Sequence, residues 1–443
     1  MSNDRELPPF NAHGDVPAGQ PEPSTIGKED EQKDKVVEQE KPEDDFEPDM
    51  FSPHPFAGPE SSPEASAPAP ATALRPAAAS IAGDFPCALR HNPGAGDLPM
   101  KFDVLVVGAG LAGAALAAAL RGSNLKVGIV EARPPARPAG WDPRIYAISP
   151  TNVEFLSGIG IWQHLDTARM APVYDMEIHG DAGGQLDFSA YDSGLRELAW
   201  IVESSLMQQE LWETVKRQHN VTLVCPAAPA ALAIDDHTAR LTLADGRRIE
   251  ARLVVAADGR DSWVRQAAGI GARNTPYDEK GVVANFRCEK PHRNTAFQWF
   301  RPDGVLAYLP LPGEYMSMVW SAPDTIADEL VALPPEALCA RVAEAGGERL
   351  GKLELVTPAA AFALRLMRVE AVVQPRLALI GDAAHAIHPL SGHGINLGYQ
   401  DARVLAEQLA ALDPWRDPGE LSILRAYARA RAEETALLQY TTH

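Results

Sequence analysis

A glycine-rich turn between two apolar runs constrains the fold of this chain more than any other feature. Residues 102–131 read FDVLVVGAGLAGAALAAALRGSNLKVGIVE. Residues 104–107 are apolar and β-branched, as in a buried parallel strand, and an Ala/Leu-rich helical run follows them to residue 121. A second apolar run, 125–130, ends at Glu131. This order of strand, turn, helix and strand predicts the βαβ unit that binds dinucleotides.

Three glycines in the turn follow the spacing G-x-G-x-x-G, at Gly108, Gly110 and Gly113. Gly108 permits the tight turn, Gly110 lets the backbone approach a pyrophosphate, and Gly113 lets helix and strand pack closely. The helix N-terminus offers free N–H groups to the phosphates, and Glu131 is placed to accept hydrogen bonds from an adenosine ribose. A membrane span is the competing interpretation of residues 104–120. These 17 uncharged residues are marginal for a bilayer, however, and a span explains none of the glycines.

Composition restricts the partners and the compartment. The formal net charge is −20, so nucleic acid and anionic membranes are poor default partners. The four cysteines are far apart and form no C-x-x-C pair, which fits a reducing cytosol better than a disulfide framework. No run of residues predicts a transmembrane helix, which leaves a surface patch as the route to any membrane contact.

The first 99 residues differ from the rest of the chain. They hold 17 of the 38 prolines and 19 acidic against 7 basic residues, and they lack apolar periodicity. Such a segment cannot bury enough apolar surface to offset its ordering entropy, so we expect residues 1–99 to be a disordered, acidic, Pro-rich tail. An interaction tail is one interpretation. We favour the other, an extension upstream of Met100, which directly precedes the first strand.

A second nucleotide-binding signal lies near the C-terminus. Residues 377–380 form a short apolar strand that ends in Gly381-Asp382, and a helix is expected from 394 to 412. A carboxylate at the carboxyl end of a strand lies where sheet ligands bind, so Asp382 can hold the hydroxyls of a ribityl chain. The glycine-rich turn before the helix lets the backbone approach a flat ring, and the helix N-terminus favours negative charge on that ring.

Three histidines in this stretch, His385, His388 and His393, raise the question of a metal site. They do not share one helix face and no cysteine cluster completes a site, so we expect no metal. Two alternatives stay open: one of them hydrogen-bonds to cofactor or substrate, or His385 packs against the sheet.

A separate sheet is predicted between the two nucleotide-binding signals. Residues 173–179 and 185–188 have the pattern of a hairpin around Gly183-Gly184. Strand patterns also dominate from residue 281 onward, with aromatic side chains at Phe286, Phe297, Trp299, Phe300, Tyr308 and Trp320. The pattern predicts an antiparallel sheet with a large apolar face, which suits the core of a substrate domain.

Three motifs stand in order: the glycine turn with Glu131, an Asp258-Gly259 segment after another apolar strand, and Gly381-Asp382. Together they resemble the class A flavoprotein monooxygenases, which have the p-hydroxybenzoate hydroxylase fold. The closer resemblance is to the hydroxylases of ubiquinone biosynthesis, whose signature is similar to residues 388–401, HPLSGHGINLGYQD.

Two positions depart from that family. His393 replaces the usual glutamine next to the flavin, and Ser204-Ser205 replaces an Asn-Arg pair. The loss of the arginine leaves its cofactor contact to another residue, such as Arg144.

The resemblance implies an α/β fold, in which a doubly wound, Rossmann-like FAD-binding domain carries an inserted mixed or antiparallel substrate sheet. It places the FAD domain in residues 100–172, 191–275 and 367–443, and the substrate domain in residues 173–190 and 276–366. Related enzymes continue past the end of this chain, so the C-terminal helices are expected to be cut short.

The last predicted helix, 421–438, should dock beside the 394–412 helix through an apolar face. Charged residues lie between its apolar positions: Arg425, Arg429, Arg431, Glu433 and Glu434. The apolar surface that a following helix covers in related enzymes is expected to be exposed here.

The resemblance also implies a function and a site. The implied enzyme is an FAD-dependent monooxygenase that hydroxylates the aromatic ring of a polyprenylated phenol, using NADPH or NADH and O2 through a C4a-hydroperoxyflavin. The implied cofactor-binding residues are Gly108, Gly110, Gly113, Glu131, Arg144, Gln208, Asp258, Gly381, Asp382, Gly392, Gly394 and Asn396. The environment of the flavin ring is assigned to Pro389, His393 and Gly394.

Partners and location follow from the same resemblance. Other proteins of ubiquinone biosynthesis are possible partners, and the expected location is the cytoplasm, with peripheral contact at the inner membrane left open. Two alternative functions remain: hydroxylation of a small soluble aromatic acid, and a non-catalytic flavin-binding interaction protein.

Overall fold

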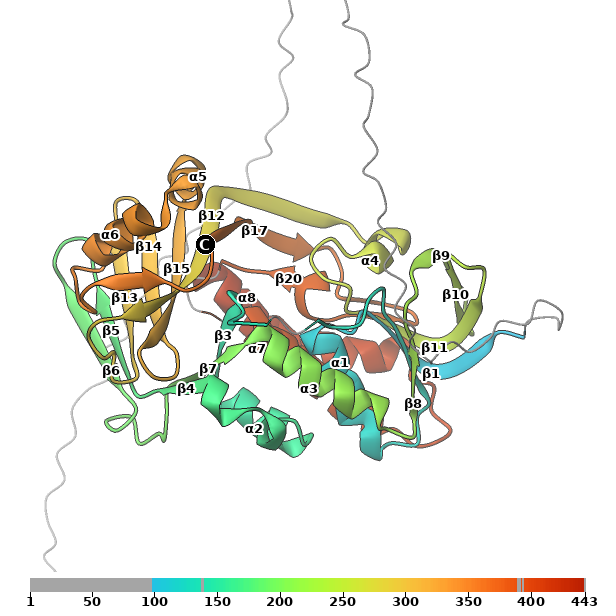
Figure 1. Ribbon diagram of the computed structural model, residues 1–443. Helices are drawn as coiled ribbons and strands as arrows, with labels where there is room; N and C mark the ends of the chain where they lie inside the picture. Colours follow the sequence, from blue (N-terminus) through green and yellow to red (C-terminus); the bar gives the residue numbers. More distant parts are fainter. Residues whose placement is uncertain (1–97, 137–138, 389–391, 393, 442–443) are drawn as a thin grey trace, which may run out of the picture. The chain divides into compact units, whose positions relative to one another are not determined.

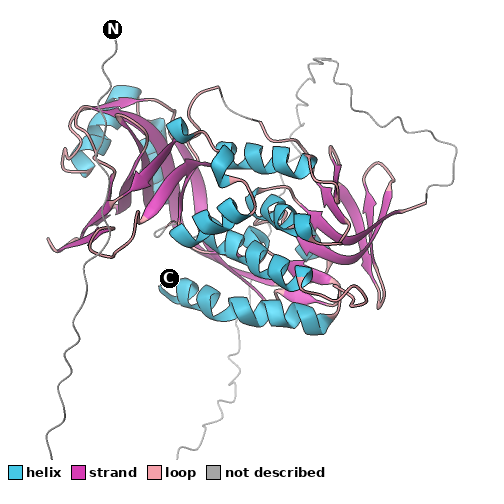
Figure 2. Cartoon of the chain, turned by 90° about the horizontal axis from the view of Figure 1, so that it is seen from below, coloured by secondary structure: helices cyan, strands magenta, loops and turns pink. Residues whose placement is uncertain are grey.

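The computed structural model describes residues 98–136, 139–388, 392 and 394–441 (Figure 1). The expected disorder of residues 1–99 therefore lies outside the described residues, apart from Leu98 and Pro99. In the described part an eight-stranded sheet lies at one end and a nine-stranded sheet at the other, with long helices between them (Figure 2). No helix in this part is long and apolar enough to cross a bilayer.

The eight-stranded sheet is built around β1 (Met100–Val107), which pairs in parallel with β2 (Val127–Val130) and β11 (Arg248–Ala256). β8 (Val221–Val224) and β19 (Leu377–Leu379) extend the sheet in parallel on either side. The antiparallel additions are β9 (Pro229–Ile234), β10 (Ala239–Leu243) and β18 (Val373–Gln374). The parallel strands with helices between them confirm the predicted α/β fold.

Both faces of β1 are buried, which explains why its sequence is apolar without alternation. Val104 and Val106 belong to a core with α1 (Leu111–Ala119), α3 (Ser204–Lys216) and α7 (Gly394–Ala410). Leu105 and Val107 belong to a second core, with β9, β10 and the short α4 (Trp263–Ala267). The alanines of α1 are almost fully buried and have small side chains, so α7 and α3 can pack closely against it.

The parallel register brings the predicted motifs to one edge of the sheet. Val107 pairs with Val130 and with Ala256, and Ala256 pairs with Leu379. Gly108, Glu131, Asp258 and Asp382 follow directly after these strand ends. Ligands of open α/β sheets bind outside the carboxyl ends of the strands, so the register supports a cofactor site at this edge.

The nine-stranded sheet has the order β20-β17-β12-β15-β14-β13-β5-β6, with β16 paired to β12. All its pairs are antiparallel except β13 with β5. One face packs against α5 (Asp324–Ala332) and α6 (Pro335–Ala345) through Phe286, Phe297, Tyr308 and Trp320. Phe300 does not join this core, since it is exposed. The strands are β5 (Asp175–His179), β6 (Gln185–Ser189), β12 (Ala272–Cys288), β13 (Thr295–Arg301), β14 (Gly304–Pro310), β15 (Tyr315–Pro323), β16 (Leu353–Leu355), β17 (Ala360–Val369) and β20 (His385–Ala386).

β12 and β17 are long strands that run past the predicted boundaries at residues 276 and 366. Their ladder is interrupted once by a bulge, where Pro276 pairs with Arg365 and the next pair is Lys280 with Ala363. Three residues of β12 therefore lie opposite one residue of β17. The positions of the domain boundaries stay a prediction.

A small third sheet joins the two large ones. It contains β3 (Ile145–Ile148), β7 (Ala199–Glu203) and β4 (Met170–Val173), all antiparallel. α2 (Pro150–Gly158) follows β3, with Pro150 at its first position, where a missing N–H costs nothing.

The last helix, α8 (Leu421–Thr441), packs against α7 as the sequence predicted. Leu424 and Tyr427 are buried, and the Tyr427 hydroxyl donates to the carbonyl of Leu379 at 3.0 Å. Leu437 and Tyr440 are exposed, at 60% and 81%.

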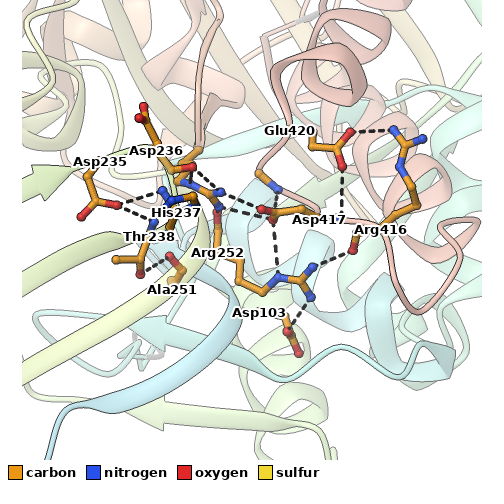
Figure 3. A network of polar contacts seen from close by, with 12 residues as sticks. Asp103, Asp235, Asp236, His237, Thr238, Ala251, Arg252, Arg416, Asp417 and Glu420 are labelled. Carbon is orange, nitrogen blue, oxygen red and sulfur yellow. Dashed lines mark hydrogen bonds and ion pairs between the residues drawn. The ribbon is translucent and has the colours of Figure 1, made fainter.

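The loop before α8 is held to the eight-stranded sheet by an arginine of β11 (Figure 3). Arg252 forms ion pairs with Asp103 of β1 at 3.2 Å and with Asp417 of the loop at 3.4 Å. It also donates to the carbonyl oxygen of Arg416 at 2.6 Å. Arg376 makes a second contact to Asp417, at 2.6 Å.

Candidate functional site

The glycine turn leaves one part of its backbone open. Gly108 has φ +102°, and a Cβ there would lie 2.3 Å from the carbonyl oxygen of Ala257. A Cβ on Gly113 would lie 2.1 Å from the carbonyl oxygen of Gly108, so helix and turn approach too closely for any side chain. Among the described residues, no atom beyond its two chain neighbours lies within 4 Å of the Cβ position of Gly110, which immediately precedes α1. The open space over Gly110 fits a phosphate at the helix N-terminus.

Glu131 is oriented by backbone N–H groups. Its Oε2 accepts from Ala109 N at 2.7 Å, inside the glycine turn, and its Oε1 accepts from Arg133 N at 3.0 Å. A carboxylate has about four acceptor positions, so the two remaining ones can receive ribose hydroxyls.

One carboxylate oxygen of Asp258 accepts a hydrogen bond within the described residues, and the other accepts none there. Its Oδ2 accepts from Val264 N at 3.0 Å, while its Oδ1 is buried with no hydrogen-bond partner among the described residues. A buried acceptor without a partner costs about 1–3 kcal/mol, so a bound ligand that donates to Oδ1 would be favoured.

The Asp382 side chain is exposed. Desolvation raises its pKa above the ordinary value, while the nearby charges of His385 and Arg260 act in the opposite direction. An exposed carboxyl at this edge of the sheet is available to accept from the hydroxyls of a ribityl chain.

Tyr146 of β3 is a neighbour of Asp382 that sequence reasoning missed. Burial raises its pKa, the charge of Asp382 raises it further, and Arg144 and a hydrogen bond with the Ser204 side chain lower it. The only feature of the sequence that could have indicated a role for Tyr146 is its position two residues after Arg144.

The Ser204-Ser205 pair, where the family often carries Asn-Arg, begins α3. Ser205 N donates to Asp142 Oδ2 at 3.0 Å, and Ser204 N donates to the carbonyl of Arg144 at 2.9 Å. Arg144 is exposed and Gln208 is half-buried. Within the described residues neither of these two side chains forms a hydrogen bond or an ion pair, so both remain available to a cofactor.

Asp401, the last residue of the signature, holds three segments together. Its Oδ2 accepts from Gly381 N at 2.9 Å and contacts His385 Nε2 at 2.7 Å, and its Oδ1 accepts from Arg431 Nε at 2.8 Å. All these side chains are buried. His385 is thus packed inside the protein with Asp401 as its partner.

The pKa of His385 reflects this arrangement. Burial opposes the charged imidazole, but the charge and hydrogen bond of Asp401, with a smaller contribution from Asp382, raise the pKa above 6.5. Desolvation likewise opposes the charged form of Asp401, and His385 and Arg431 together lower its pKa below 3.8. The three groups therefore form a buried row of contacts, in which the charge of Asp401 favours the protonated imidazole of His385.

His388 has different neighbours, in the β12 bulge. Its Nε2 lies 3.1 Å from Glu279 Oε2, and its ring meets the Tyr277 ring edge-on at 4.9 Å between centroids. Asp278, between these two residues, has φ +56°. In the described part of the chain no group of three or more His, Cys, Asp or Glu side chains is placed to hold a metal ion.

The side chain of Asn396 is fully engaged with protein groups. Its Oδ1 accepts from Ser149 N and Asn152 Nδ2, at 3.0 and 2.8 Å, and its Nδ2 donates to the carbonyls of Ala147 and Gly392, at 2.8 and 3.1 Å. A cofactor contact would therefore come from its backbone N–H in the first turn of α7. Asn152 and Gln400, which complete this network at 2.6 Å, were not predicted.

Two predicted positions of the ring environment, Pro389 and His393, lie outside the described residues. Gly392 is described, with φ +63°, and Gly394 begins α7. The open turn at Gly110, the unpartnered Asp258 oxygen and the exposed Asp382 carboxyl all fit an FAD molecule along this edge of the sheet.

Comparison with known proteins agrees with this geometry. Residues 101–438 match the FAD binding domain family. The chain is 36% identical to ubiquinone hydroxylase UbiL of Rhodospirillum rubrum over 362 residues, covering 81% of this chain and 83% of that protein. It is 35% identical to 3-demethoxyubiquinol 3-hydroxylase of Escherichia coli, covering 76% and 87%. It is 31% identical to the human mitochondrial ubiquinone biosynthesis monooxygenase COQ6, covering 77% and 84%.

Solved structures share the fold. PqsL of Pseudomonas aeruginosa superposes with a TM-score of 0.67 at 23% identity, covering 77% of this chain and 95% of PqsL. The p-nitrophenol 4-monooxygenase PnpA of Pseudomonas putida superposes with a TM-score of 0.64 at 19% identity, covering 78% and 88%. The family match and the similarity to these relatives, together with the geometry of the site, show that this chain belongs to the FAD-dependent monooxygenases, in the family of the ubiquinone-biosynthesis hydroxylases.

Proposed function

We propose that this enzyme hydroxylates the aromatic ring of a polyprenylated phenol in ubiquinone biosynthesis, with NADPH or NADH as reductant and O2 as oxygen donor. FAD, when bound, supplies the electron transfer and oxygen chemistry. The protein's own residues bind and orient the cofactor, exclude water and admit the substrate.

The observation that carries the substrate class is an open apolar edge on the substrate sheet. Phe188 and Leu186 of the edge strand β6 lie directly opposite Met176 and Ile178 of β5. Residues paired in this way point to the same face of a sheet. Leu186 and Phe188 are 54% and 45% exposed, and Tyr191 beyond them is 90% exposed. Clustered exposed apolar side chains mark a surface that binds apolar material, and a polyprenyl chain is such a ligand.

The apolar edge continues inward to polar groups near the cofactor side. Met176 pairs with Ala296 of β13, and both Met176 and the half-buried Leu309 pack against the buried cluster that contains Ala296. Leu309 pairs with Ser317, and Ser317 pairs with Asn285.

Two buried oxygens at the inner end, Ser317 Oγ and Asn285 Oδ1, have no hydrogen-bond partner among the described residues. Asn285 Nδ2 donates to the carbonyl of Asp142, two residues before Arg144, at 3.1 Å. This arrangement fits a substrate with an apolar tail at the sheet edge and a phenol hydroxyl at the inner end. A small soluble aromatic acid would make no use of the apolar edge.

In this proposal the site residues have separate tasks. The turn around the pyrophosphate is shaped by Gly108, Gly110 and Gly113. Glu131 accepts hydrogen bonds from the ribose hydroxyls, and Asp382 accepts hydrogen bonds from the ribityl hydroxyls. Arg144, Gln208 and Asp258 supply further cofactor contacts, and Gly381 and Gly392 shape the loops. Pro389, His393 and Gly394 form the surroundings of the flavin ring, with the backbone of Asn396 at the start of α7.

The test is a deletion strain complemented with variants. Loss of the gene should lower ubiquinone and accumulate a prenylated precursor, whose mass identifies the missing hydroxyl. Phe188→Glu should restore ubiquinone poorly, because a charge at the apolar edge repels the prenyl chain. Val331→Glu is the matched control, since Val331 is also exposed but lies on α5, on the opposite face of the sheet. Unchanged ubiquinone in the deletion strain would reject the proposal.

We extend the proposal to location: the same apolar edge makes peripheral contact with the inner membrane, where a polyprenylated substrate resides. Phe188→Glu should then reduce flotation of the enzyme with vesicles, whereas Val331→Glu should leave it unchanged. Equal flotation of both variants with the parent enzyme would place any membrane contact elsewhere.

A further inference from the structure

Two arginines face each other across the long ladder of the substrate sheet. Arg273 of β12 and Arg368 of β17 are a direct antiparallel pair, and both side chains are exposed. Like charges directly opposite each other in a sheet are destabilising. Their pairing at this position therefore favours the binding of a compensating negative charge.

The protein itself does not supply that charge within the described residues. Neither guanidinium forms an ion pair or a hydrogen bond there, although Arg365, three residues before Arg368, pairs with Asp261. The carboxyl of Glu370 lies over Gly271 and also makes no ion pair with either arginine. The chain has 60 acidic against 40 basic Lys and Arg residues, so the lack of a partner does not reflect a shortage of carboxylates.

The two arginines line a cavity together with Thr275 and Leu366. Thr275 and Leu366 are themselves a direct pair in the same ladder, two residues along each strand from the arginines. The cavity has a volume of about 170 Å³, against roughly 30 Å³ for a water molecule in the liquid. Two arginines, a threonine and a buried leucine thus line a space large enough for a tetrahedral anion.

We propose that this cavity binds the phosphate group of a phosphate ester. The planar guanidinium presents paired N–H donors that match phosphate oxygens, and charge-assisted bonds of this kind are stronger than neutral ones. Bound phosphate would also cancel the repulsion between Arg273 and Arg368. The ester is a nicotinamide dinucleotide or a lipid headgroup, which share this chemistry.

The site is close in the sheet to the predicted flavin loop. Arg368 pairs on its other side with His385 of β20, the strand that leads into residues 389–394. A dinucleotide held here by a phosphate would therefore be anchored one strand away from the segment expected to contact the flavin ring.

The primary test is thermal stability of the FAD-loaded enzyme in inorganic phosphate, compared with chloride at equal ionic strength. Phosphate should raise the melting temperature of the parent enzyme by several degrees at saturation, because a ligand that binds only the folded state stabilises it. Arg273→Gln and Arg368→Gln should each abolish this shift. In chloride each variant should melt at or above the parent temperature, because the repulsion is relieved.

Arg248→Gln is the matched control. Arg248 is exposed on β11 and has no ion pair among the described residues, so its removal changes the net charge equally without touching the cavity. This variant should keep the full phosphate shift. A phosphate shift that survives in Arg368→Gln, or that is absent from the parent enzyme, would overturn the proposal.

Two further measurements identify the source of the phosphate. If the site holds a dinucleotide, Arg368→Gln should raise KM for NADPH or NADH about tenfold or more, with binding to phosphatidylglycerol vesicles unchanged. If it holds a headgroup, vesicle binding should fall and KM should stay the same. If neither changes, no phosphate ester of either kind uses the cavity and the proposal is wrong. The thermal-shift result does not depend on the aromatic substrate proposed above.

Discussion

Arg431 of α8 donates a hydrogen bond from Nε to Oδ1 of Asp401 in α7, at 2.8 Å, and both side chains are buried. The second oxygen of Asp401 accepts from the backbone of Gly381, next to Asp382. One carboxylate therefore connects the last helix of the chain to the loop expected to hold the ribityl chain of FAD.

Asp401→Asn should destabilise the protein strongly. The substitution leaves the buried guanidinium of Arg431 and the buried ring of His385 without their shared carboxylate. Breaking a buried ion pair costs about 3–5 kcal/mol of unfolding free energy. Urea denaturation of the FAD-loaded enzyme measures this loss. Asp413→Asn, at an exposed position before α8, should change the unfolding free energy little.

The contribution of His385 to stability should depend on pH in one direction. Its pKa is raised in the folded state, so its contribution is complete below the unfolded pKa, about 6.5, and is lost as pH rises through the folded pKa. The difference in unfolding free energy between the parent enzyme and His385→Asn should therefore be largest near pH 6 and shrink at alkaline pH. A difference that grows with rising pH would contradict the protonated state of His385.

Asp382→Ala should weaken FAD retention, because the ribityl hydroxyls lose their acceptor. We expect a roughly tenfold or greater rise in the FAD dissociation constant, measured by flavin fluorescence during dialysis. Asp192→Ala removes an exposed carboxyl from the loop after β6 and should retain FAD like the parent enzyme. Equal retention in both variants would remove Asp382 from the cofactor site.

The two ends of the chain should differ in importance. A chain that starts at Met100 should keep FAD, because the composition of residues 1–99 supports no core. A chain that ends at Asp413 loses Leu424, Tyr427 and Arg431, together with the Asp417 contacts to the sheet, and should melt at a lower temperature and release flavin. Flavin loss from the first chain and retention by the second, with an unchanged melting temperature, would reverse these roles.

The strand–turn–helix motifs could be read from the sequence because their residues are close together in it. The close contacts that require glycine at positions 108 and 113 lie within the same βαβ unit or at the adjacent strand end, at Ala257. The spacing of these glycines alone therefore indicates their roles. The signature ends at Asp401, but no role was predicted for this residue from the sequence.

Partners that are distant in sequence could not be predicted in the same way. Arg431 was expected among the charged residues between the apolar positions of the last helix, yet it is buried. Burial of a guanidinium requires a partner such as a carboxylate, and the partner here, Asp401, is 30 residues away in the sequence. Tyr146, Asn152 and the pair Arg273–Arg368 were missed for the same reason, since each acquires its meaning from a neighbour brought close by folding.

The bulge in β12 has a mechanical consequence. A bulge bends the strand that carries it and increases the local twist, so the ladder of β12 and β17 departs from a straight course where its pairing is interrupted. That place is the bulge, which carries Tyr277 and Glu279 against His388, immediately before the predicted flavin loop. A change in the bend of the substrate sheet at this bulge would therefore first shift the segment that leads to the predicted flavin loop.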